Sequence, residues 1–239
     1  METYYLGAYW QPRQESLNDC VRRIQELLIC AGGCDPCFRY WYRLGRSKAQ
    51  ALSNVVSSDL TSIQSLVMKG VHHSADGNTI EELGYHVGMW NGAESDDEAT
   101  NLSITCGCFS PSAKNSCVIS LPAKGDAAER ILRYPKLRML VQCTVQAFEP
   151  DWCVVMSRSY RDSLSTWSAD EPRAGWLLYI SHRFGRLPTF RWNVQTDNVN
   201  APGMLLIATT EQFSVSNATH VQAAEVIDQM LREGGLLNG

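Results

Sequence analysis

Three closely spaced cysteines, Cys30, Cys34 and Cys37, are the first residues whose types and spacing could do chemistry. Cys34 and Cys37 form a Cys-x-x-Cys pair, which can hold zinc or act as a redox dithiol. Two adjacent histidines further along the chain, His72 and His73, could supply nitrogen ligands to the same metal. However, the second Cys-x-x-Cys pair of a zinc ribbon is missing, and the surrounding pattern is not that of a thioredoxin-like redox motif. We therefore predict that these thiols pack a helix junction, and that the chain uses no metal or other cofactor.

Nucleophilic catalysis requires a serine or cysteine beside a histidine that an acidic residue orients. The sequence contains no Gly-x-Ser-x-Gly elbow, and Gly32-Gly33 lacks the Lys-Ser or Lys-Thr that would complete a phosphate loop. His86, His182 and His220 fall within or at the ends of expected strands and helices, with no evident partners. We predict no catalytic residue and a chain that is not an enzyme.

An acidic run, Glu94-Ser-Asp-Asp-Glu98, leaves two interpretations open. Runs of charge are usually solvated loops. This run also follows Trp90-Asn91-Gly92, and tryptophan often anchors protein interfaces. The second interpretation predicts a partner-binding site made of Trp90, Asn91, Glu94, Asp96, Asp97 and Glu98.

Hydrophobic periodicity predicts the elements that would position these residues. In the first half, the pattern predicts a strand over residues 3–10 and a helix over 17–28. A short aromatic helix after Asp35 and a helix over 59–69 follow, and then three strands over 85–91, 101–109 and 116–121. In the second half, the pattern predicts a helix after Pro135. Four strands follow, over residues 152–157, 176–181, 189–195 and 204–209, and a last helix covers 217–232. This order predicts an α+β fold in which antiparallel sheets, as two meanders, pack with several helices. We expect a single compact unit over residues 1–239, with two lobes, about 1–125 and 126–239, as the alternative.

Charge and composition restrict the partners. The net charge is −4, yet residues 51–100 hold eight acidic residues against one basic residue, a local charge of −7. Direct nucleic-acid binding needs a basic stripe, so we predict none, whereas an acidic segment suits a basic protein partner. No apolar run is long enough to cross a membrane, and the first residues do not resemble a secretory signal. We expect a cytoplasmic protein whose nine cysteines are reduced and mostly buried.

Several segments together resemble immunity protein family 52 of bacterial polymorphic toxin systems. They include Leu6-Gly7-Ala8-Tyr9-Trp10-Gln-Pro-Arg13-Gln-Glu15, Ile80-Glu81-Glu82-Leu83-Gly84-Tyr85, Trp90-Asn91-Gly92, Pro150-Asp151-Trp152 and Gly175-Trp176-Leu177. The resemblance implies that the chain binds a toxin encoded by an adjacent gene, a nuclease of the restriction-endonuclease-like class that type VI secretion can deliver. It supplies no inhibitory residues, and Gly84 and Gly92 are better explained by backbone geometry.

The leading hypothesis is therefore stoichiometric inhibition of a nuclease toxin through a protein–protein interface, with occlusion of the toxin's active site favoured over allosteric blockade. The rival hypothesis is a thiol- or zinc-dependent hydrolase that uses Cys34, Cys37, His72 and His73. A structural homodimer without a toxin partner is a third hypothesis, and self-association is also compatible with the first.

Overall fold

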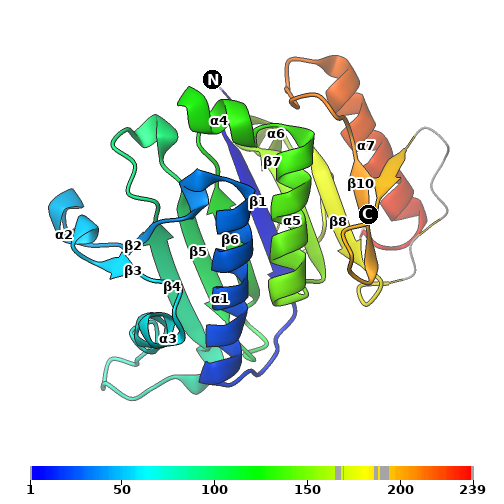
Figure 1. Ribbon diagram of the computed structural model, residues 1–239. Coiled ribbons are helices and arrows are strands. Elements are labelled where there is room, and N and C mark those ends of the chain that lie inside the picture. Colours follow the sequence, from blue (N-terminus) through cyan, green and yellow to red (C-terminus); the bar gives the residue numbers. More distant parts are fainter. Residues whose placement is uncertain (1, 165–167, 169, 186–187, 189–193, 238–239) are drawn as a thin grey trace.

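One ten-stranded antiparallel sheet runs through the whole molecule (Figure 1). The computed structural model describes residues 2–164, 168, 170–185, 188 and 194–237. The sheet order is β3-β2-β4-β5-β6-β1-β7-β8-β10-β9. The strands are β1 (Tyr4–Trp10), β2 (Trp41–Arg43), β3 (Val55–Val56), β4 (Tyr85–Trp90), β5 (Asn101–Cys106), β6 (Asn115–Ser120), β7 (Trp152–Ser157), β8 (Leu177–Ser181), β9 (Gln195–Asp197) and β10 (Gly203–Ile207).

The predicted α+β class is confirmed, and so is the first antiparallel meander, β4-β5-β6. The second half forms antiparallel strands in the order β7-β8-β10-β9, and the two halves share one sheet. β1 joins them, because it pairs with β6 on one side and with β7 on the other. All seven residues of β1 are buried, as expected for a strand with neighbours on both edges. The expected strand over residues 189–195 lies mostly outside the described residues. The choice of one unit over two lobes stays a prediction, which the continuous sheet favours.

Three helices lie on one face of the sheet, in front of it in Figure 1: α1 (Leu17–Cys34), α3 (Leu60–Met68) and α5 (Tyr134–Phe148). α1 begins at a capping box, in which Ser16 and Asp19 satisfy each other's backbone N–H groups. The buried positions of α1 follow helical spacing from Cys20 to Cys34, so one stripe of the helix faces the sheet. These three helices confirm the periodicities found in the sequence.

The expected helix after Asp35 is wrong. Asp35 does cap a turn of 3₁₀ helix, Pro36–Phe38, but the chain then extends into β2. The aromatic residues Trp41 and Tyr42 favour a strand, and β2 pairs with β3 and β4. The other helices are α2 (Lys48–Leu52), α4 (Gly125–Ile131), α6 (Arg158–Ser163) and α7 (Ala218–Glu233), of which only α7 was expected.

The expectation of nine reduced cysteines is wrong for two of them. Cys30 of α1 and Cys143 of α5 form a disulfide that closes a sequence separation of 113 residues. The other seven are free, and all of them except Cys37 are buried. The sequence could not reveal this pairing, because only the packing of α1 against α5 brings the two thiols together.

Asp228 is a buried carboxyl group on α7, where one of its oxygens accepts a hydrogen bond from the backbone N–H of Ala174 at 2.7 Å. Burial raises the pKa of this carboxyl from 3.8 to about 6. A raised pKa means that the folded state binds the proton more tightly than the unfolded state does. This contribution to stability is therefore complete below about pH 4 and is lost as the pH rises through about 6.

We expect Asp228→Asn to raise the free energy of unfolding more at pH 7.5 than at pH 4.5, by about 2 kcal/mol, because asparagine keeps the acceptor without the buried charge. Urea denaturation of both proteins at the two pH values measures this difference. Asp126→Asn, at an exposed site, serves as the control. An equal effect of Asp228→Asn at both pH values would contradict the prediction.

Candidate functional site

The predicted acidic run forms an ordered loop between β4 and β5. Its residues Asp96–Glu98 make a turn of 3₁₀ helix, and the hydroxyl of Ser95 accepts a hydrogen bond from the N–H of Asp97. Asn91 closes the base of the loop: its side-chain oxygen accepts from the N–H groups of Ala93 and Thr100, at 3.3 and 3.0 Å. Asn91 therefore shapes the loop from within. We name residues Glu94–Glu98 the acidic loop.

The acidic loop keeps most of its charge in solvent. Glu94 and Asp96 are exposed, whereas Asp97 and Glu98 are half-buried. The carboxylate of Asp97 forms an ion pair with Lys124 at 2.7 Å, which offsets one of the four negative charges. Glu94 and Asp96 are thus the members most available to a partner.

Trp90 lies at the end of β4, beside the acidic loop. Its ring is 6.2 Å from the ring of Tyr42 on β2, and the ammonium group of Lys48 lies over it at 5.8 Å. The same ammonium group donates to the backbone oxygen of Glu94 at 2.9 Å, so Lys48 ties α2 to the loop. Gly92 has a φ of 79°, and a Cβ atom there would overlap the ring of Tyr42, so this turn requires glycine.

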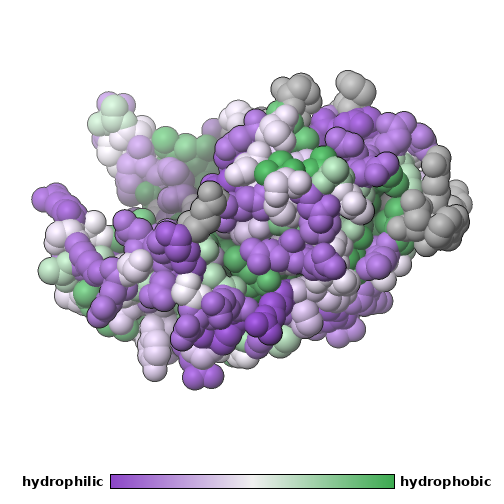
Figure 2. Space-filling model, turned by 90° about the horizontal axis from the view of Figure 1, so that it is seen from above, coloured by the Kyte–Doolittle hydropathy of each residue, from purple (hydrophilic) through white to green (hydrophobic). Residues whose placement is uncertain are grey.

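The face of the sheet opposite α1 and α3 is partly open to solvent at β2, β4 and β5. Val87 and Met89 of β4 are buried, while the residues that alternate with them are half-buried or exposed. Seen from above in Figure 2, the molecule is hollowed on the side away from α1, toward the left. The strand register places these outward residues side by side, and we name them the open sheet face: Tyr42, His86, Gly88, Trp90, Asn101, Ser103 and Thr105.

Apolar side chains border the open sheet face. Leu44, which follows β2, packs near Gly88 and is 55% exposed, and Val55 of the edge strand is 64% exposed. Val55 pairs with Tyr42, and Tyr42 pairs with Trp90. An apolar and aromatic surface therefore continues from the sheet edge to the acidic loop.

The residues of the hydrolase hypothesis do not come together. Cys34 ends α1, and burial raises its pKa. The loop that holds His72 and His73 lies beside the start of β4, where Val71 bridges to Tyr85. That end of the sheet contacts Cys20 near the start of α1. Fourteen residues of helix, about 20 Å of rise, thus separate the histidines from Cys34. Within the described ranges, no group of three or more His, Cys, Asp or Glu residues could hold a metal.

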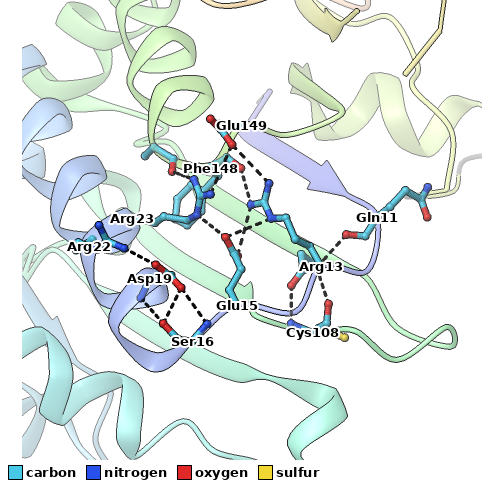
Figure 3. Close-up of polar contacts among 12 residues, drawn as sticks. Gln11, Arg13, Glu15, Ser16, Asp19, Arg22, Arg23, Cys108, Phe148 and Glu149 are labelled. Atoms are coloured by element: carbon cyan, nitrogen blue, oxygen red, sulfur yellow. Dashed lines mark hydrogen bonds and ion pairs between the residues drawn. The ribbon is translucent and has the colours of Figure 1, made fainter. Parts of the chain in front are cut away.

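A charged network that sequence reasoning missed lies at the opposite end of β5 from the acidic loop (Figure 3). Glu15, whose side chain is 6% exposed, forms ion pairs with Arg13 at 3.2 Å and with Arg23 at 2.5 Å. The two guanidinium groups also donate to the backbone oxygens of Phe148 and Ala147 at the end of α5, each at 2.8 Å. This network joins the segment before α1 to the end of α5. The carboxylate of Glu15 is enclosed by these two arginines.

These features define a class: an α+β protein built on one open antiparallel sheet. None of the described helices is both long and apolar enough to cross a membrane. The comparisons with known proteins name the family. The model of the family Immunity protein 52 matches residues 2–239, so the chain belongs to that family.

A solved structure shares the fold. The chain resembles a structure titled "Pseudomonas aeruginosa T6SS protein PA0821", with a TM-score of 0.51, 11% sequence identity, and coverage of 95% of this chain and 73% of that one. No curated protein matches the chain in sequence.

Proposed function

We propose that this chain neutralises a cognate toxin by binding it stoichiometrically, and that the toxin is a nuclease of the restriction-endonuclease-like class. Membership of the Immunity protein 52 family supports the immunity role. The structural neighbour's title supports an association with type VI secretion. The toxin would be the product of an adjacent gene. The resemblance noted in the sequence is the basis for its nuclease class.

The observation that carries the proposal is the acidic loop beside an outward tryptophan. A nuclease must hold phosphate groups, so its active site presents basic side chains. Carboxylates can occupy the place of those phosphates and block the substrate. Glu94 and Asp96 are free to do so because they are exposed at one end of the open sheet face. Occlusion of the active site is therefore the mechanism that we favour over allosteric blockade.

The open sheet face supplies the rest of the contact. A stable complex buries about 1,200–2,000 Å² in total, more than a five-residue loop provides. Trp90, Tyr42, Leu44 and Val55 offer aromatic and apolar area next to the loop. We propose that the toxin covers this face and that the acidic loop lies at the edge of the interface. Self-association of the chain stays a prediction.

We also propose that the chain acts in the cytoplasm, where a nuclease toxin would meet nucleic acid. An oxidising compartment would preserve the Cys30–Cys143 disulfide, whereas a reducing compartment can open it to two thiols. Alkylation of intact cells with a maleimide before lysis, followed by mass analysis, distinguishes these two states.

Co-expression with the adjacent gene's product tests the immunity role directly. We expect toxin expression alone to stop growth, co-expression to restore it, and the two proteins to co-purify in equal amounts. A catalytically inactive toxin variant should still bind. Toxicity without rescue and without a complex would contradict the proposal.

Removing the two exposed charges of the acidic loop should slow binding. We expect Glu94→Gln/Asp96→Asn to reduce the association rate several-fold at low salt and to weaken its dependence on salt, because electrostatic attraction accelerates encounter. Stopped-flow association with the inactive toxin across a salt series measures both effects.

The matched control removes two exposed charges elsewhere, as Glu26→Gln/Asp76→Asn. If this control and the loop variant slow association equally, the net charge of the chain decides the rate. The proposal that the acidic loop itself accelerates association would then be rejected, while the immunity proposal would stand.

A further inference from the structure

Three cysteines meet where α1 packs against α5. Cys30 and Cys34 are four residues apart on α1, so they lie one helical turn apart on the same side of the helix. Cys143 of α5 faces both of them. It forms the disulfide with Cys30, and its Sγ atom lies 3.6 Å from the Sγ atom of Cys34.

The third thiol is held in place. The thiol of Cys34 donates to the backbone oxygen of Cys30 at 3.4 Å, and Cys34 is buried. Cys143 is buried as well, whereas Cys30 is half-buried. The free thiol of Cys34 is therefore kept in contact with the Cys30–Cys143 disulfide inside the protein. Cys143 thus has two possible partners, Cys30 and Cys34.

We propose that Cys30, Cys34 and Cys143 form a disulfide-exchange site, in which Cys143 bonds to either cysteine of α1. In the exchange, the thiolate of Cys34 attacks Sγ of Cys143 and the Cys30–Cys143 bond breaks. Cys30 leaves as a thiolate and takes up the proton that Cys34 has lost. The number of disulfides is unchanged, so the exchange needs no oxidant. The first disulfide requires one, and a small disulfide such as oxidised glutathione, reduced to two thiols, serves.

The surroundings set how fast each step is. A small oxidant meets Cys30 first, because Cys30 is the most accessible of the three. Burial raises the pKa of the Cys34 thiol, and the nearby Lys136 ammonium opposes that effect. Since the thiolate is the attacking species, exchange should accelerate as the pH rises.

Either linkage holds the same two helices together. The Cys34–Cys143 bond would close a sequence separation of 109 residues, close to the 113 of the observed bond. Both bonds therefore restrict the unfolded chain by about the same amount. The fold keeps a covalent link between α1 and α5 even when Cys30 is occupied by another thiol.

The test removes the observed partner of Cys143. Residues 24–38 contain no lysine or arginine, so trypsin leaves Cys30, Cys34 and Cys37 on one peptide, and variants must resolve the linkage. Purified Cys30→Ser/Cys37→Ser is oxidised with glutathione disulfide at pH 8, quenched with acid and N-ethylmaleimide, and mapped by mass spectrometry without reduction. We expect a Cys34–Cys143 bond in most molecules and a melting temperature about 5–15 °C above that of the reduced variant.

Cys34→Ser/Cys37→Ser is the matched control, which should form only the Cys30–Cys143 bond and gain a similar shift. The proposal is overturned if Cys30→Ser/Cys37→Ser keeps a native circular dichroism spectrum while Cys143 is still alkylated. If that variant does not fold, the wild-type protein held at pH 9 decides: fragmentation of the linked peptide either detects the Cys34–Cys143 bond or rejects the proposal.

Discussion

Replacing Trp90 by alanine is expected to weaken toxin binding about 30-fold, the equivalent of about 2 kcal/mol. Trp90 stands where the open sheet face meets the acidic loop, between the ring of Tyr42 and the ammonium group of Lys48. A large aromatic side chain that a partner can cover completely is the kind that dominates binding energies. Trp90 is half-buried in the free chain, and the part of its surface that is still exposed can be buried in the complex.

Titration calorimetry with an inactive toxin variant measures this effect, and thermal unfolding shows whether the fold is intact. Met139→Ala is the matched control: Met139 is a 42% exposed hydrophobic residue on α5, away from the open sheet face. We expect its replacement to leave affinity unchanged. Equal affinities for Trp90→Ala and the wild type, with both proteins folded, would place the interface elsewhere.

The second large effect concerns stability and arises in the network of Figure 3. We expect Glu15→Ala to lower the free energy of unfolding by about 3 kcal/mol, because it leaves two partly buried arginines without their shared carboxylate. The side chains of Arg13 and Arg23 are 26% and 22% exposed, so solvent replaces only part of the lost interaction. The junction between the start of α1 and the end of α5 should loosen first. Urea denaturation followed by tryptophan fluorescence measures the loss.

Glu149→Gln is the comparison within the same network. Glu149 is 56% exposed and lies 3.5 Å or more from Arg23 and Arg13, so its removal should cost less than about 1 kcal/mol. If both variants lose the same free energy of unfolding, the enclosure of Glu15 by arginines adds no stability beyond that of an exposed ion pair.

The part of the fold that could be predicted from sequence is the part with a regular pattern. The first meander was predicted because Val87 and Met89 alternate with outward residues, and Leu102 and Ile104 do the same on the next strand. Helices α1, α3, α5 and α7 were predicted because their apolar residues recur at helical spacing. The aromatic segment after Asp35 was misread because three or four residues are too few to distinguish a helix from a strand.

The candidate site was predictable only in its composition. The sequence places Trp90 beside four acidic residues, and the family resemblance suggests a toxin as partner. It does not show that Asn91 is bound within the loop, that Lys124 pairs with Asp97, or that Lys48 lies over Trp90. Each of these contacts joins residues whose distance depends on the pairing of strands or the approach of another helix.

By itself, the sequence determined the alternation of strands and helices and the local excess of negative charge. Those properties are local, so neighbouring residues suffice to express them. Tertiary structure alone decided that β1 joins the two halves into one sheet, that Cys143 reaches Cys30 and Cys34, and that Glu15 is enclosed by arginines. These outcomes depend on contacts between residues far apart in the chain, which form only when burial of the whole apolar core offsets the entropy of closing such long loops.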